Sequence, residues 1–382
     1  MKVYPRTSVS EFLNDFIVYR NLTPLDKRIP SLDDVRARAD VPVGITPRKS
    51  QDAYARVIVQ LLQAARVLDA PDDAIERLIY IGDTRLNDGT AFVNIARAGD
   101  WPGLAFIASE KSQPLPPEII EKDTPSACSL YLANTWAAID NFEQFCRERN
   151  FPIDEHTAII VDIDKTTIGA RGRNDHVINQ VRVEAVRRTV EHLLGADFDA
   201  DAFQVNYAEL NQTEFHHFTT DNQDYLAYVC LILGSGLYSL GLLVESIRTG
   251  QIGSFEQFIA SVDDAADQLP PSLGDIHRSI YTRVQAGDPT PFKAFRRNEY
   301  LATIERMGCL DDDASVDDLL ANEIVITQEV REAALRWKAA GALLFGLSDK
   351  PDEASLPTDE LAAQGYQSIH RVETHALGGI SD

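Results

Sequence analysis

The pattern of apolar and polar residues predicts strands that alternate with helices over the first 165 residues. Apolar side chains recur at three- and four-residue spacing in 50–69, which predicts an amphipathic helix. Short runs that are apolar throughout predict buried strands, and 157–163 (TAIIVDI) is the clearest of them. The predicted strands lie at 77–81, 104–108, 157–163 and 342–347, and the other helices predicted around them lie at 90–98, 127–149 and 332–340.

From about residue 175 to residue 335, helical periodicity dominates and the sequence predicts no convincing strand. The longest apolar stretch, 225–244, lies here and approaches the length of a membrane span. Its Gly-Ser-Gly interruption and its polar flanks favour a buried pair of helices instead. In the polar last thirty residues, 366–372 is a weak strand candidate. We therefore expect a core whose first part is 1–170, a helical domain at 171–335, and a second part of the core at 336–382.

Strands that alternate with helices predict a parallel sheet with helices on both faces, which is the doubly wound α/β fold class. In such sheets, ligands bind beyond the carboxyl ends of the strands. The residues that directly follow each predicted strand are therefore the candidates for a functional site.

Composition and charge narrow the class of protein. The chain has 382 residues, enough for two domains, and its 36 basic and 59 acidic residues give a formal net charge of −23. Phosphate backbones require basic patches, so we expect neither nucleic acid nor a membrane as a partner. Because the four cysteines form no CxxC pair and no signal peptide is recognised, we expect a cytoplasmic protein without zinc. The sequence does not indicate an oligomeric state.

Two carboxylates stand at the end of the clearest strand, in the segment Asp162-Ile163-Asp164-Lys165-Thr166. Alternate residues of an extended segment point the same way, so Asp162 and Asp164 share a face. Their repulsion must be offset, either by a hard cation such as Mg²⁺ or by a raised pKa on one acid, which would make it a general acid. Taken alone, such a pair is more typical of a helix or loop cap.

Three further segments place polar residues at the ends of elements. Asp83 and Asp88 follow the strand at 77–81 and could complete a metal site, although an Asp there also suits a helix N-cap. Ser348 follows the strand at 342–347 and could bind a phosphoryl oxygen, although Ser-Asp and Pro are also turn residues. Lys49 precedes the helix at 50–69 and could neutralise clustered carboxylates, whereas an isolated lysine is ordinarily solvated.

Together these four segments resemble the four motifs of the haloacid dehalogenase-like (HAD) superfamily. DIDKT resembles its first motif, LLFGLS its second, Lys49 before a helix its third, and GDTRLND its fourth. The family's order is first to fourth, whereas this chain runs third, fourth, first, second. The resemblance therefore implies a circularly permuted HAD-like Rossmannoid core, with a helical cap at 171–335. The tail, 351–376, would then supply what normally precedes Lys49, and residues near 376 and near 40 should lie on the same edge of the core.

The resemblance also implies roles for individual residues. Asp162 would attack the substrate phosphorus to form an aspartyl-phosphate, and Asp164 would act as the general acid and base. Asp162, the backbone carbonyl of Asp164 and Asp83 would hold Mg²⁺, and Asp88 would help either directly or by orienting Lys49. Lys49 and Ser348 would bind phosphoryl oxygens.

Three more residues belong to the predicted substrate site. Thr166 would support the loop after the first motif and lie beside the bound phosphate. Arg171 and Arg173 follow that loop and could reach an anionic substrate; the alternative is a flexible basic hinge.

The function expected on these grounds is a Mg²⁺-dependent phosphatase acting on a small phosphorylated metabolite. One alternative is a non-catalytic HAD-like module that binds a phosphorylated ligand or a protein, and another is a phosphotransferase. The presence of Asp164 favours phosphoryl chemistry over dehalogenation, because the HAD family members that cleave haloalkanoates need no acid at that position.

Overall fold

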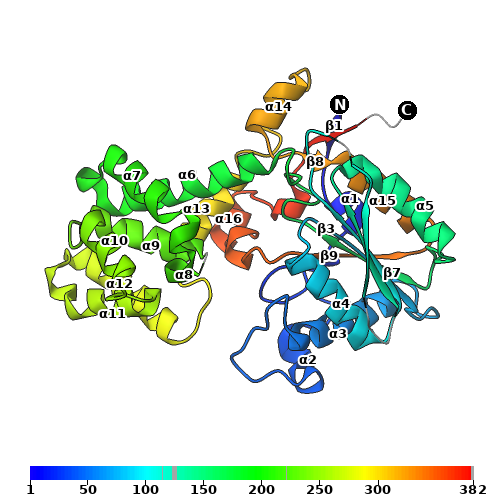
Figure 1. Cartoon of the computed structure of the whole chain (residues 1–382), viewed down its shortest axis with the longest axis horizontal. Helices are drawn as coiled ribbons and strands as arrows, with labels where there is room; N and C mark the ends of the chain where they lie inside the picture. Colours follow the sequence, from blue (N-terminus) through cyan, green and yellow to red (C-terminus); the bar gives the residue numbers. More distant parts are fainter. Residues whose placement is uncertain (114, 123–126, 221, 380–382) are drawn as a thin grey trace. The chain divides into compact units, whose positions relative to one another are not determined.

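The computed structural model describes residues 1–113, 115–122, 127–220 and 222–379. The chain forms two compact units (Figure 1). The first, here called the sheet unit, comprises Met1–Gln180 and Thr303–Asp382, and the second, the helical unit, comprises Val181–Ala302. The helical unit is shorter than the predicted segment 171–335, because residues at both ends of that segment make their contacts in the sheet unit.

The sheet unit is built on a seven-stranded sheet of order β2-β9-β7-β3-β4-β6-β5. The pair β5–β6 is antiparallel and the other pairs are parallel. The predicted mixed α/β class with a mainly parallel sheet is therefore confirmed. The strands are β2 (Ile17–Val18), β3 (Arg77–Gly82), β4 (Gly103–Ala108), β5 (Glu118–Lys122), β6 (Cys128–Ala133), β7 (Thr157–Asp162) and β9 (Leu343–Leu347).

Helices cover both faces of this sheet (Figure 1). The central strands β7 and β9 are buried along their whole length, which explains why they read as continuous apolar runs. One face carries α2 (Leu32–Ala39), α3 (Asp52–Asp69) and α4 (Asn87–Gly99), and the other carries α1 (Ser10–Leu13), α5 (Ile139–Glu148) and α15 (Gln328–Ala339).

Two predicted elements are wrong. The helix expected at 127–149 begins only at Ile139, because 128–133 forms the strand β6 between β4 and β5. A short apolar run fits a buried strand or a buried helix equally well, and pairing with two neighbouring strands decides between them. The strand candidate at 366–372 contains a 3₁₀ turn, and the strand lies after it, at β10 (Thr374–Gly378).

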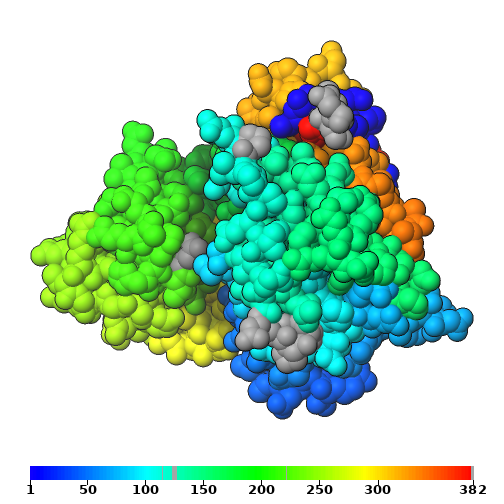
Figure 2. Space-filling model, turned by 45° about the vertical axis from the view of Figure 1, so that its right-hand side comes forward, coloured from blue at the N-terminus to red at the C-terminus, as the bar shows by residue number. Residues whose placement is uncertain are grey.

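The two ends of the chain meet in a second, three-stranded sheet. There β10 pairs antiparallel with β1 (Lys2–Thr7) and parallel with β8 (Ile326–Thr327). Figure 2 shows the dark blue N-terminal residues beside the orange residues near 310–325. An ion pair between Arg6 and Asp312 joins the same segments.

The meeting of the ends differs from the one that the permutation predicted. Ala376 lies opposite Tyr4, whereas α2, which ends next to residue 40, lies at the far side of the sheet unit (Figure 1). The strand beside β9 comes from the head of the chain, where Ile17 pairs with Gly346. The prediction that residues near 376 and near 40 lie on the same edge of the core is therefore wrong. The head of the chain, rather than 351–376, completes this edge of the sheet.

The helical unit contains no strand among its described residues. The apolar stretch 225–244 forms parts of two helices, α9 (Gln223–Gly234) and α10 (Leu240–Arg248), as predicted. Around them pack α7 (Ala200–Leu210), α11 (Phe255–Asp264) and α12 (Pro271–Gln285). In the described residues, no helix combines the length and the apolar character needed to cross a membrane.

Candidate active site

The ends of three neighbouring parallel strands bring the predicted motifs to one edge of the sheet. Asp162, the last residue of β7, is in register with Leu347 on β9, so Ser348 lies directly beyond its neighbour. On the other side of β7, Ile81 is in register with Val161, so Asp83 also follows the end of its strand. The convergence arises because parallel strands in register end at the same level.

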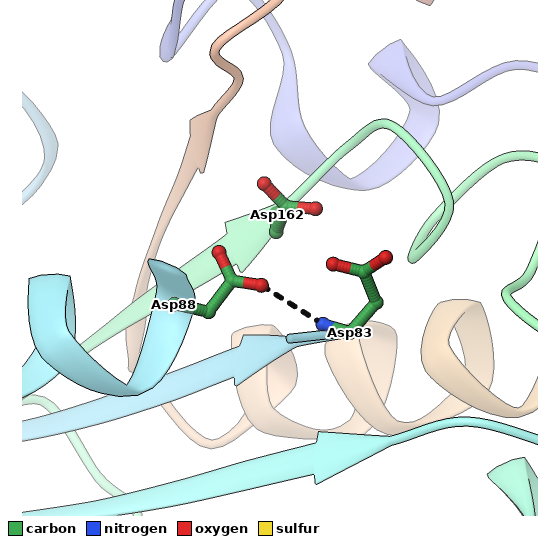
Figure 3. A group of neighbouring side chains, drawn as sticks. All are labelled: Asp83, Asp88 and Asp162. Carbon is green, nitrogen blue, oxygen red and sulfur yellow. Dashed lines mark hydrogen bonds between the residues drawn. The ribbon is translucent and has the colours of Figure 1, made fainter. Parts of the chain in front are cut away.

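Three buried aspartates form a cluster at this edge. Ligand oxygens of Asp83, Asp88 and Asp162 lie within 4.8 Å of one another. Figure 3 shows Asp83 after the end of β3, Asp88 at the start of α4 and Asp162 at the end of β7, with their carboxylates around one space. Carboxylates this close and this buried repel one another unless cations or protons offset their charge.

Asp88 is the anchor of the loop that carries Asp83. Its Oδ2 accepts hydrogen bonds from the backbone N–H groups of Asp83 (3.1 Å) and Thr84 (2.9 Å) and from the Thr84 hydroxyl (2.8 Å). Its Oδ1 accepts one from the Tyr80 hydroxyl (3.1 Å). A Cβ on Gly82 would lie 2.7 Å from the carboxyl carbon of Asp88, so this approach requires glycine.

Lys49 is the buried cation of the cluster. Its Nζ donates to Asp88 Oδ1 at 2.6 Å and to Asp162 Oδ1 at 2.8 Å. Burial alone would lower the pKa of Lys49, but Asp162 and Asp88 raise it well above the ordinary value. The lysine is therefore charged, and the alternative of a solvated surface lysine is wrong, since its side chain is only 6% exposed.

The pKa values of the three aspartates are shifted in different directions. Burial, reinforced by Asp88, raises the pKa of Asp83 to about 7. Burial also raises the pKa of Asp162 well above its ordinary value, and Lys49 opposes this only in part. Burial also acts to raise the pKa of Asp88, but Lys49, together with hydrogen bonds from Asp83 and Thr84, outweighs burial and lowers that pKa. One buried lysine thus leaves the cluster short of positive charge.

The loop after β7 holds Asp162 in place. The backbone N–H groups of Thr167 and Ile168 both donate to the carbonyl of Ile163, which coils the chain tightly. Thr166 donates its hydroxyl proton to Asp162 Oδ2 at 3.0 Å, as the predicted supporting role requires. Thr167, which sequence reasoning missed, donates its hydroxyl to the Asp162 carbonyl at 2.8 Å.

Asp164 and Ser348 lie at this edge but outside the carboxylate cluster. Asp164 is half-buried in the loop after β7, and its side chain does not belong to the group of three acids. Ser348 is buried, and its hydroxyl accepts a hydrogen bond from the Lys350 N–H at 3.1 Å. The catalytic role of Asp164 and the phosphoryl contact of Ser348 stay predictions.

The structure separates the two predicted arginines. Arg171 Nε donates to Asp83 Oδ2 at 2.5 Å, and its side chain is 35% exposed, so it belongs to the site. Arg173, two residues on, is 3% exposed and pairs with Glu329 at 2.9 Å and Glu110 at 3.1 Å. Its guanidinium joins α15 to the loop after β4, and this geometry does not favour the predicted substrate contact.

Sequence reasoning missed several residues that shape the site. Tyr80, Gly82 and Thr84 all serve Asp88, and their proximity to the Gly-Asp pair was the available signal. Comparison of the chain with protein-family models, with curated proteins and with solved structures found no match.

Proposed function

We propose that this protein is a Mg²⁺-dependent phosphohydrolase in which Asp162 is the nucleophile. The observation that carries the proposal is the environment of its carboxylate. Lys49 contacts one oxygen and Thr166 the other, and two more buried carboxylates lie beside it. A nucleophile held in one orientation next to a fixed cation is what an attack on an anionic phosphate group requires.

The residues present fit a hard divalent cation. Asp83, Asp88 and Asp162 offer oxygen donors within 4.8 Å of one another, which is the donor type that Mg²⁺ prefers. The excess of buried negative charge gives the protein a physical reason to bind such an ion. When bound, Mg²⁺ would neutralise charge on the transferring phosphoryl group and orient it. The resemblance to HAD enzymes adds the backbone carbonyl of Asp164 as a further ligand.

The proposed reaction has two steps. In the first, an Asp162 oxygen bonds to phosphorus while the bond from phosphorus to the ester oxygen breaks, and Asp164 gives its proton to the leaving oxygen. In the second, water attacks the aspartyl-phosphate, Asp164 takes a proton from that water, and phosphate leaves as Asp162 returns to its carboxylate form.

Two residues would bind the phosphoryl oxygens. A lysine ammonium has three donors, and Lys49 uses two of them on Asp88 and Asp162, so its third can reach the substrate. Ser348 would add a hydroxyl from the neighbouring strand end. Arg171 would contribute from the exposed side of Asp83.

The test is phosphate release from p-nitrophenyl phosphate by the full chain, with Mg²⁺ and with EDTA. We expect release only with Mg²⁺, and a loss of at least about 10³-fold in Asp162→Asn, because no other group replaces the nucleophile. Asp72→Asn, at an exposed loop position, is the matched control and should keep full activity. Mg²⁺ binding without turnover over a panel of phosphate esters would instead favour the non-catalytic module. Phosphate transfer to an added alcohol would favour the phosphotransferase.

A further inference from the structure

Four large aliphatic side chains are exposed on three loops at the carboxyl edge of the seven-stranded sheet. Their exposed fractions are 92% for Val43, 54% for Ile45, 81% for Leu86 and 62% for Leu115. We call these four residues the apolar rim. Single exposed aliphatic residues are normal on a protein surface, but the position of these four and the contacts that hold them set them apart.

Leu86 lies on the loop that carries the carboxylates. It stands between Asp83 and Asp88 and directly precedes α4. The backbone of this loop is fixed, because the Asp88 N–H donates to the Thr84 carbonyl at 3.0 Å and Asp88 holds Thr84 in return. The contacts that place two acids in the site thus also keep Leu86 in solvent.

Val43 and Ile45 precede the buried lysine. Their loop is pinned by Arg36, whose guanidinium donates to the carbonyls of Pro42 at 3.0 Å and Ile45 at 2.6 Å. Lys49 follows Ile45 by four residues, so these side chains lie near the point where the chain enters the site.

Leu115 is held at the end of a more distant strand. Its N–H donates to Oδ1 of Asn134, and Nδ2 of the same side chain donates to the Gln113 carbonyl. Asn134 directly follows β6, which is three strands from β7. At roughly 4.8 Å between strands, Leu115 lies about 15 Å to the side of the Asp162 strand end.

We infer that the substrate of the proposed phosphohydrolase is a phosphate ester whose alcohol part is apolar, and that the apolar rim contacts this part. The inference rests on the proposed function. The floor of the site is ionic and suits the phosphate group, whereas the fixed loops above it present aliphatic side chains. With its phosphate at Lys49, the rest of such an ester would extend past the loop of Asp83 and Asp88, which carries Leu86. Covering the apolar rim with hydrocarbon removes apolar surface of both partners from water, whereas a sugar or a glycerol group would give up part of its own hydration there.

The experiment compares two esters with equivalent leaving groups, hexyl phosphate and glycerol 1-phosphate. Both are primary alkyl phosphates, so a difference in kcat/KM reports contacts with the alcohol part. We expect the wild-type chain to favour hexyl phosphate, and Leu86→Ser to lower its kcat/KM about 10-fold while glycerol 1-phosphate is unaffected. Val67→Ser removes another exposed aliphatic residue, 60% exposed, from the far end of α3 and should change neither value.

The outcomes separate this inference from the proposed function. A preference for glycerol 1-phosphate, or an equal loss for both esters in Leu86→Ser, overturns the apolar substrate. If neither ester is hydrolysed, titration calorimetry with hexylphosphonate decides. If Leu86→Ser weakens the binding of hexylphosphonate about 10-fold, the apolar contact is supported and only the proposed catalysis is contradicted. If Leu86→Ser leaves the binding unchanged, the apolar contact is overturned as well.

Discussion

Each unit of this protein buries a cluster of acids, and the two clusters are built differently. In the helical unit, Asp224 and Glu299 are both in contact with Arg296, whose guanidinium donates to Asp224 at 2.7 Å and to Glu299 at 2.6 Å. Arg182 contacts Glu299 as well, at 3.4 Å. Asp224 also accepts the backbone N–H of Phe292 at 3.0 Å. Within the described residues, two acids thus meet two arginines.

In the sheet unit, three acids meet one buried lysine and one partly exposed arginine. Lys49 serves Asp88 and Asp162, and Asp83 depends on Arg171 at the surface. Buried acids are thus not by themselves a sign of a functional site, since a paired set can hold helices together. An excess of acid at the end of parallel strands is the feature that points to a bound cation.

The strongest test of this comparison removes the central cation of each cluster. Lys49→Met and Arg296→Met should each lower the free energy of unfolding by about 3–5 kcal/mol, because each leaves uncompensated buried charge. Saturating Mg²⁺ should restore much of the loss in Lys49→Met and none in Arg296→Met. Urea unfolding followed by tryptophan fluorescence measures the sheet unit, because it holds all three tryptophans, and circular dichroism follows both units. If Mg²⁺ restored the stability of both variants equally, the proposed difference between the two acid clusters would be wrong. The tryptophans are Trp101, Trp136 and Trp337.

The next test uses pH. The pKa of Asp83 is about 7 in the folded chain and near 3.8 when unfolded, so the folded state holds a proton more tightly. Its stabilising contribution is complete below pH 4 and is lost as pH rises through 7, which amounts to about 4 kcal/mol. Urea unfolding in EDTA between pH 4 and pH 8 should show this fall, and Asp83→Asn should make it smaller, with the remainder coming from other buried acids such as Asp162. If the free energy of unfolding falls with pH equally steeply in Asp83→Asn, the raised pKa of Asp83 is contradicted.

Metal binding should stabilise only the sheet unit. At a Mg²⁺ concentration 100 times the Kd, linkage predicts a gain of about 2.7 kcal/mol in the free energy of unfolding. Asp83→Asn should lose most of this gain because it removes a ligand. Glu299→Gln alters the helical cluster instead, and there the gain from Mg²⁺ should persist. Thermal unfolding with and without Mg²⁺ measures the increment in each variant.

The smallest expected effects come from two glycines. Gly82→Ala places a methyl group against Asp88 and should cost about 1–3 kcal/mol, with weaker Mg²⁺ binding. Gly274 lies in α12 with no atom within 4 Å of a Cβ, so Gly274→Ala should instead add about 0.5–1 kcal/mol. The urea midpoint of each variant shows whether it is less or more stable than the wild-type chain. An unchanged midpoint in Gly82→Ala would show that Asp88 can move at little cost.

Much of the sheet unit could be predicted because its central strands have local signals. The segments 77–81, 157–163 and 342–347 are too apolar to lie anywhere but inside, and each is followed by polar residues at the edge where ligands bind. This reasoning located Asp83 and Asp162, whereas Lys49 was a candidate because it precedes the helix predicted at 50–69. It failed for β6, because a run as short as 128–133 has no distinguishing period and its partners lie elsewhere in the chain.

By itself, the sequence determined which short segments are buried and which acids follow them, because burial patterns and strand ends are local properties. Only the tertiary structure decided the use of each charged group. Arg171 and Arg173 are the same residue type two positions apart, yet one faces Asp83 and the other is buried against Glu329, 156 residues away. Such partners arrive through strand order and register, which no local pattern encodes.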